Sequence, residues 1–228
     1  MLFIGLDDTD TLDSRGTGHL ARLIAAELAQ EYPLLGVTRH QLLIDPRVPC
    51  TRNNSSAAIL LHANGRFDLR GLAERVRALM LANFEPGSDP GLCVACDVPP
   101  EVTRFGQRVK CEMVRQSDAC ALAEAWDIPL LGLGGDQGGV IGALAAVGLA
   151  ATGEDGRYVL VGRSRELSGL QPIDALLCAG ITAVKTIDGN AVTKGLVETD
   201  KLRPARRGGL PVAVVEWKGD RWFPLKLD

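Results

Sequence analysis

The chain has 228 residues, of which 46% are apolar and 23% charged, and a net charge of −3. This is the balance of a folded globular protein rather than a disordered one. The slightly acidic charge gives no general reason to expect a nucleic-acid partner, because phosphate binding requires a basic surface. The start MLFIGLDDTD lacks the basic residues and long apolar core of a signal peptide, and the longest apolar region, residues 140–151, is too short to cross a membrane. We therefore expect a cytoplasmic protein.

The first 98 residues predict six elements in the order βαββαβ. Short apolar runs bounded by turn residues indicate strands, whereas apolar residues at intervals of three and four indicate helices. The predicted strands are residues 2–6, 36–44, 56–62 and 91–98, and the predicted helices are residues 19–32 and 69–82. This order is the split βαβ, or ferredoxin-like, arrangement.

Residues 99–228 predict a second α/β lobe, so that the whole chain is of the α/β (α+β) class. The predicted helices are residues 101–109, 117–126 and 140–151, and the predicted strands are residues 158–162, 182–187, 211–217 and 222–227. Residues 188–210 have few apolar positions and are expected to form a long loop. Its basic run, residues 201–207, is either a solvated surface or a contact for a polyanion.

The six cysteines are expected to be free thiols in a chain of this size without a secretion signal. Cys93 and Cys96 form a C-x-x-C pair inside a predicted strand. Side chains three apart on a strand point to opposite faces, so the pair is badly placed for one metal ion. We reject a zinc site there.

The strongest local motif is the acidic cluster Asp7, Asp8 and Asp10, which follows the first predicted strand and precedes a glycine-rich helix start. Carboxylates at the carboxyl end of a strand lie where open α/β sheets place ligands. Carboxylate oxygens suit Mg²⁺, which usually keeps waters and phosphate oxygens as well. The glycines Gly16 and Gly18 would let backbone N–H groups at the start of the helix approach an anion.

Aspartates in front of a helix also serve as caps and turn formers, and the spacing alone leaves both interpretations open. The same holds for a second glycine-rich segment, residues 132–142, which contains Gly138, Gly139 and Gly142. It opens the third helix of the second lobe, and close helix packing explains it as well as phosphate binding does. It is not a P-loop, because no G-K-[ST] follows.

A third segment, PRVPCTRNNS at residues 46–55, contains Thr51, Arg52 and Asn54. Arginine, threonine and asparagine in one loop suit a phosphate or sugar ligand. A solvated hairpin loop is the alternative.

These segments resemble, in the same order, those of a known family. The stretch I-G-L-D-D-T-D followed by R-G-T-G-H-L-A is similar to the N-terminal part of the archaeal isoleucine-tRNA 2-agmatinylcytidine synthetases. The loop L-I-D-P-R-V-P-C-T-R-N-N-S-S-A, the pair Pro90-Gly91 and the run G-G-V-I-G-A-L-A-A-V-G match three further family segments. The resemblance covers roughly residues 1–165.

The resemblance implies an ATP-dependent enzyme with a kinase-like and a ferredoxin-like region. In that family agmatine is attached to a cytidine of the tRNA anticodon after the base is activated by phosphorylation. The family's roles fall on matching positions here: Mg²⁺ and ATP phosphates on Asp7, Asp8 and Asp10; the phosphorylated threonine on Thr17; and the nucleotide cleft on Gly16, Gly18, Thr51, Arg52, Asn54, Gly138, Gly139 and Gly142.

The sequence also departs from the family pattern. No segment matches the family's OB-fold domain or zinc ribbon. Cys50 stands where the family has a lysine, Asn53 where it has a glycine, and Gly18 where it has a second threonine.

The first hypothesis is an ATP- and Mg²⁺-dependent phosphoryl-transfer or ligase-type enzyme. Its acceptor could be an RNA, a nucleoside or a small amine. The alternatives are a nucleotide-binding sensing module without turnover and the catalytic subunit of a tRNA-modifying complex. The sequence does not fix the oligomeric state.

Overall fold

The structure, a computed structural model, describes residues 1–48, 50–51, 53–62 and 67–227. The chain divides into two compact units, residues 1–152 and 153–228. The boundary predicted from the sequence lay between residues 98 and 99, whereas the structure places the division after residue 152. The helices that follow residue 98 belong to the first unit, because they pack on its sheet.

The first unit begins with the predicted βαββαβ series and continues with three more helices and a short strand. Its elements are β1 (Leu2–Asp7), α1 (Thr17–Leu28), β2 (Leu34–Gln41), β3 (Ser55–Leu61), α2 (Leu69–Leu81), β4 (Gly91–Cys96), α3 (Pro100–Cys111), α4 (Gln116–Ala125), β5 (Leu130–Gly132) and α5 (Val140–Thr152). The ferredoxin-like prediction is confirmed in order and type, whereas β5 was not predicted.

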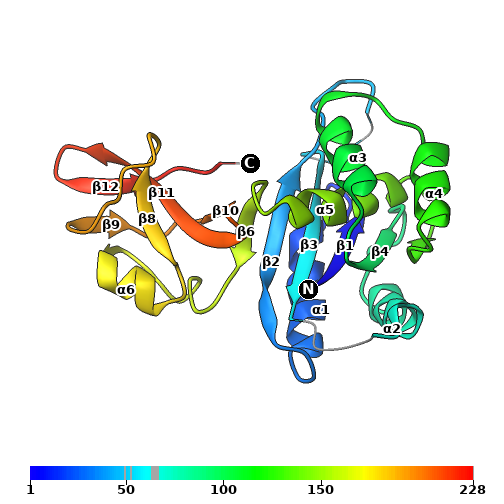
Figure 1. The fold of residues 1–228 in the computed structure, drawn as a ribbon, viewed down its shortest axis with the longest axis horizontal. Helices are drawn as coiled ribbons and strands as arrows, with labels where there is room; N and C mark the ends of the chain where they lie inside the picture. The colour runs from blue at the N-terminus through cyan, green and yellow to red at the C-terminus, as the bar shows by residue number, and fades with distance from the viewer. Residues whose placement is uncertain (49, 52, 63–66, 228) are drawn as a thin grey trace. The chain divides into compact units, whose positions relative to one another are not determined.

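The strands of the first unit form an antiparallel sheet in the order β5-β4-β1-β3-β2 (Figure 1). The third strand lies between the first two, as the split βαβ arrangement requires. Gly5 of β1 is paired with Ala58 on one side and with Cys93 on the other. Strand β1 is therefore central, and the aspartates that follow it leave the sheet at its middle.

Helices cover both faces of this sheet, and the sequence of β1 reflects it. Leu2, Ile4 and Leu6 alternate with Phe3 and Gly5, and all five are buried, as expected for a strand with a helix layer on each side. Gly5 lies directly under α5, where an added Cβ would come within 2.0 Å of a backbone carbonyl oxygen. Helix α5 is accordingly apolar all around and nearly fully buried.

The second unit is a mostly antiparallel sheet with one short helix. Its elements are β6 (Arg157–Leu160), β7 (Leu170–Pro172), α6 (Ile173–Cys178), β8 (Ala183–Thr186), β9 (Leu196–Glu198), β10 (Ala205–Arg207), β11 (Leu210–Lys218) and β12 (Arg221–Pro224). The strand order is β6-β10-β11-β12-β9-β7, and β8 pairs with β11 in parallel. The loop expected at residues 188–210 contains the short strands β9 and β10, which have too few apolar residues for the sequence pattern to reveal.

Part of the basic run at residues 201–207 has a structural role inside this second unit. The side chain of Arg206 is buried and donates to the hydroxyl of Tyr158 at 2.6 Å and to the carbonyl of Gly209 at 2.6 Å. Its guanidinium also lies over the Tyr158 ring, 5.9 Å from the ring centre. Arg206 thus holds β10 and the following turn together rather than facing solvent.

Two further predictions concern cysteines and membranes. All six cysteines are free thiols, as predicted, and Cys93 is buried within β4 while Cys96 is partly exposed. Within the part of the chain that the structure describes, no helix is both long enough and apolar enough to span a bilayer.

Candidate functional site

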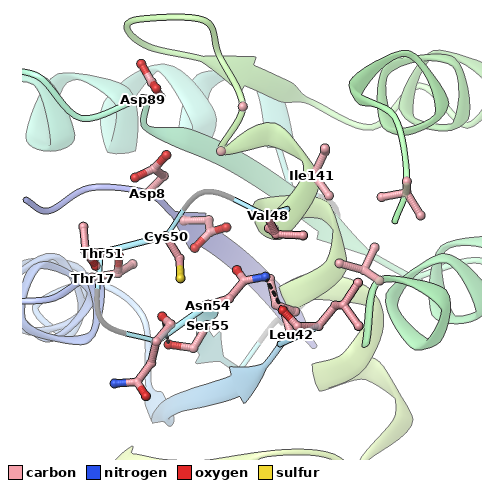
Figure 2. Close-up of a pocket in the computed structure, with 18 of the residues that line it drawn as sticks. Asp8, Thr17, Leu42, Val48, Cys50, Thr51, Asn54, Ser55, Asp89 and Ile141 are labelled. Atoms are coloured by element: carbon pink, nitrogen blue, oxygen red, sulfur yellow. Dashed lines mark hydrogen bonds between the residues drawn. The ribbon is translucent and has the colours of Figure 1, made fainter. Parts of the chain in front are cut away.

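A cavity of about 270 Å³ opens in the first unit where β1 ends. It is formed by the loop after β1, the start of α1, the segment between β2 and β3, the turn before β4, the end of α3 and the start of α5. Figure 2 shows its two ends. Asp8, Asp89, Thr17 and Thr51 lie on one side, and the apolar side chains of Leu42, Val48 and Ile141 lie on the other.

The backbone at Asp8 separates two neighbouring carboxylates. Asp8 has a φ of +50°, in the left-handed region that aspartate enters more readily than most residues. The chain therefore turns sharply directly after β1. Asp7 packs against α5 at Gly142, where an added Cβ would lie 1.7 Å from its Oδ2 atom. Gly142 is needed so that the Asp7 carboxylate can fit beneath the helix.

The charges at this end of the cavity oppose one another. Burial, and next the negative charge of Asp8, raise the pKa of Asp7 to about 7. Loss of water contact, and next the charge of Asp89, raise the pKa of Asp8 to about 6. Both causes act because carboxylates stand close together in a partly dehydrated place. The acidic end is therefore a place where added positive charge is favourable.

Asp10 joins α1 to the loop before β3. Its Oδ1 accepts the backbone N–H of Thr17 at 3.0 Å and the hydroxyl of Thr17 at 2.9 Å. Its Oδ2 accepts the hydroxyl of Thr51 at 3.2 Å. The cap interpretation of the acidic motif thus holds for Asp10, which satisfies an N–H group at the helix start. The same contacts place two hydroxyl groups beside a carboxylate inside the cavity.

The glycine-rich segment before α5 wraps around an aspartate that the sequence motifs did not indicate. Asp89 accepts the N–H of Asp136 through Oδ1 at 3.1 Å and the N–H of Gly139 through its carbonyl at 3.1 Å. The N–H of Gly138 donates to the Asp136 carboxylate at 2.7 Å. A Cβ on Gly139 would approach the Asp89 carbonyl to 2.4 Å. Close packing therefore accounts for these glycines, and these three N–H groups already have protein acceptors.

The other end of the cavity is apolar apart from one amide and a carboxylate. Its walls come from the end of β2, the end of α3 and the first turn of α5: Leu42, Leu43, Val48, Val109, Met113, Val114 and Ile141. Glu112 also lines the cavity here. Asn54 lies between the two ends and donates its Nδ2–H to the carbonyl of Leu43 at 2.8 Å.

The cavity brings together most of the residues predicted from the sequence. Those that line it are Asp7, Asp8, Asp10, Thr17, Thr51, Asn54, Gly138, Gly139 and Gly142. Gly16 and Gly18 do not line it but flank Thr17 at the start of α1. Arg52 lies outside the described residues. Asp89 and Asp136 also line the cavity and were not predicted. Asp89 precedes the Pro90-Gly91 pair, so its place beside that matching segment was a usable signal.

The donor set at the acidic end can be compared with what a divalent cation needs. Five aspartates line the cavity, and oxygen donors of this kind fit Mg²⁺: they are Asp7, Asp8, Asp10, Asp89 and Asp136. In the ranges that the structure covers, no three acidic, histidine or cysteine side chains are grouped closely enough to enclose a metal ion. Mg²⁺ usually takes only one or two carboxylates and completes its shell with water and phosphate oxygens, which this arrangement can accommodate.

The fold and the cavity define an α/β protein with an acidic ligand cleft at the end of its central strand. No protein-family model matches the chain. Two curated relatives do: the tRNA 2-agmatinylcytidine synthetases TiaS of Methanopyrus kandleri, 29% identical over 157 residues, and of Thermococcus sibiricus, 30% identical over 154 residues. The matches cover 68% and 64% of this chain but 35% of each relative, so the chain spans about a third of the length of these proteins. The chain contains an N-terminal region of the TiaS family, as its motifs predicted.

Solved structures agree in fold. The chain is similar to a TiaS complex with tRNA and ATP, with a TM-score of 0.56 and 24% identity, covering 64% of this chain and 36% of the other. It is also similar to apo TiaS, with a TM-score of 0.53, 24% identity, and coverage of 64% and 35%. A third likeness is to a TiaS complex with tRNA, AMPCPP and agmatine, with a TM-score of 0.54, 22% identity, and coverage of 64% and 35%. At these identities the likeness establishes the fold.

Proposed function

We propose that this protein binds ATP with Mg²⁺ in the cavity at the end of β1 and transfers its γ-phosphoryl group, as a phosphoryl-transfer or ligase-type enzyme. The observation that carries the proposal is the pair of hydrogen bonds from Thr17 to Asp10, beside a concentration of carboxylates. The relationship to TiaS supports ATP as the nucleotide, since a TiaS structure contains ATP.

Charge balance supports the requirement for Mg²⁺. A triphosphate among five aspartates would be repelled unless cations came with it, since bound metal ions are often the largest local charges in such sites. Asp8 would hold the ion, with Asp7 and Asp10 beside it. When bound, the ion would neutralise the phosphate oxygens and draw the raised pKa values of Asp7 and Asp8 down. This binding role is proposed for all three aspartates.

Thr17 is the proposed acceptor of the phosphoryl group within the enzyme. Its hydroxyl donates to Asp10 at 2.9 Å, which is the geometry of a nucleophile beside its base. In the proposed step the Thr17 oxygen bonds to the γ-phosphorus. The bond from that phosphorus to the bridging oxygen breaks and ADP leaves. The hydroxyl proton passes to the Asp10 carboxylate. Positioning and charge neutralisation supply most of the acceleration in such transfers.

The direct test is the intact mass of the protein after incubation with ATP and Mg²⁺. The wild-type chain should gain one phosphoryl group and release one ADP, whereas Thr17→Val should gain none. Thr17→Ser keeps a hydroxyl at the same place and should still be modified. Asp10→Asn should slow the reaction at least about a hundredfold, because it removes the base. A nearby surface variant, Asp13→Asn, should react like wild type.

Each outcome bears on the proposal. Modification of Thr17→Val would exclude this residue as the acceptor. Nucleotide binding without modification or ADP release would favour the alternative of a sensing module that lacks turnover. Absence of Mg²⁺-ATP binding by the wild-type chain would refute the nucleotide proposal. If Thr17 is modified, the acceptor beyond it, including RNA or a small amine, is sought by adding candidates to the phosphorylated protein.

A further inference from the structure

The apolar end of the cavity has no role in the proposed phosphoryl transfer, yet it is continuous with the acidic end. Leu42 and Val109 are buried in its wall, and Ile141 faces it from the first turn of α5 (Figure 2). Apolar walls with a few fixed polar groups are what a ring-shaped ligand moiety requires. Phosphates belong at the cation-attracting end. The part of a nucleotide that suits the apolar end is therefore its base.

One polar group at this end is held in a fixed orientation. The Asn54 side chain donates Nδ2–H to the Leu43 carbonyl at 2.8 Å. A carbonyl only accepts, so this bond decides which amide atom is nitrogen and which is oxygen. Leu43 is itself fixed, since its N–H donates to the carbonyl of Val109 at 3.0 Å. The Oδ1 atom of Asn54 consequently points away from Leu43 toward the middle of the cavity (Figure 2).

The backbone of Asn54 is also anchored. Its carbonyl accepts the N–H of Leu42 at 2.9 Å and the Nε2–H of Gln41 at 2.6 Å. An acceptor fixed on both main chain and side chain can distinguish a donor from another acceptor, because a mismatched partner leaves it unpaired. The exocyclic amino group of adenine or cytosine is a donor, whereas the corresponding oxygen of hypoxanthine or uracil is an acceptor.

We propose that Asn54 and the apolar wall around Ile141 form a base-recognition subsite that selects a nucleobase carrying an exocyclic amino group. This rests on the proposed nucleotide function and adds which part of the ligand each residue recognises. The base comes either from the ATP or from a nucleoside acceptor. Both present the same chemistry, a flat ring with an amino donor.

The experiment is calorimetric titration of the full chain with Mg²⁺ and four ligands: ATP, ITP, CMP and UMP. The wild type should bind ATP over ITP, or CMP over UMP, by about tenfold, the value of one hydrogen bond lost in a desolvated place. Asn54→Ala should remove that preference. Asn83→Ala is the matched control, because Asn83 also donates Nδ2–H to a backbone carbonyl, that of Leu79 at 2.8 Å, but is exposed just after the end of α2.

The apolar wall is tested with a pair of isoleucines. Ile141→Ala should weaken binding of the preferred ligand about tenfold, as expected when roughly 1.4 kcal/mol of apolar contact is lost. Ile44→Ala, whose native side chain is 82% exposed, should not change binding. Circular dichroism and thermal melting verify that each variant folds, and Ile141→Val gives a milder substitution at the same place.

The outcomes separate this inference from the proposed function. A preference for ATP over ITP that depends on Asn54 assigns the subsite to the nucleotide. A preference for CMP over UMP that depends on Asn54 assigns it to the acceptor. Equal binding of ATP and ITP together with equal binding of CMP and UMP, unchanged in Asn54→Ala, would overturn the inference while leaving nucleotide binding intact. If the wild-type chain binds none of the four, both the proposed function and the subsite are overturned.

Discussion

Replacing Asp7 with asparagine should stabilise the protein at pH 8 in the absence of divalent cations. Burial, and next the charge of Asp8, raise the pKa of Asp7 from 3.8 to about 7 in the native chain. The native state therefore binds more protons than the unfolded state between these two values. Stability consequently falls as pH rises through this window and is lowest above about pH 7. Asparagine keeps the size of the side chain and removes the charge.

The magnitude follows from the two pKa values. A pKa of about 7 against 3.8 corresponds to a cost of at most about 4 kcal/mol at pH 8, at 1.36 kcal/mol for each tenfold change in proton affinity. Even half of that would raise the melting temperature of a unit of this size by several degrees. The assay is thermal melting of wild type and Asp7→Asn with EDTA at pH 5, 6, 7 and 8.

The expected result is a gain in stability that grows from pH 5 to pH 8. Asp45→Asn is the control of opposite sign, because the Arg47 guanidinium, at 2.7 Å, holds the pKa of Asp45 below its usual range. That variant should bring no gain at pH 8. If Asp7→Asn melted at or below the wild-type temperature at pH 8 and kept the wild-type pH dependence, the argument from burial of charge would be refuted.

Packing and thiol burial can be probed as well. Gly5→Ala should destabilise the first unit by about 1–3 kcal/mol or more, because its Cβ would overlap a backbone carbonyl of α5, whereas Gly16→Ala, which has only a carboxylate oxygen nearby at 3.9 Å, should cost far less; chemical denaturation that ranks them equally would contradict this. In the folded protein Cys93 should resist a maleimide reagent, since burial raises the pKa of its thiol, while the exposed Cys50 should react and be protected by Mg²⁺-ATP; rapid Cys93 labelling, or Cys50 labelling unaffected by nucleotide, in peptide mass spectra would count against the fold or the site respectively.

Local sequence patterns were sufficient to predict the main elements of the first unit. Strand β1 could be predicted because its apolar run is short and ends at three aspartates, and α2 because apolar residues recur at helical intervals over a full three turns. The helices α3, α4 and α5 were predicted within one to two residues of their observed ends. The motif at residues 7–10 also located the acidic end of the cavity.

The short strands could not be predicted in the same way. Strands β5, β7, β9 and β10 have three residues each, too few for an alternating pattern to emerge. They exist because neighbouring strands supply hydrogen-bond partners, which is a property of the assembled sheet. The division of the chain likewise depends on α5, which packs on β1 although the two are far apart in the sequence.

The composition of the site emerges from tertiary contacts. Asp89 and Asp136 are ordinary turn residues in the sequence, and they act on Asp8 only because the sheet places the turn before β4 beside the end of β1. Ile141 and Leu42 become one apolar wall only when α5 crosses the sheet near the end of β2. Local patterns encode which residues favour a strand, a helix or a turn. The pairing of strands and the packing of helices on them determine which of those residues share a cavity.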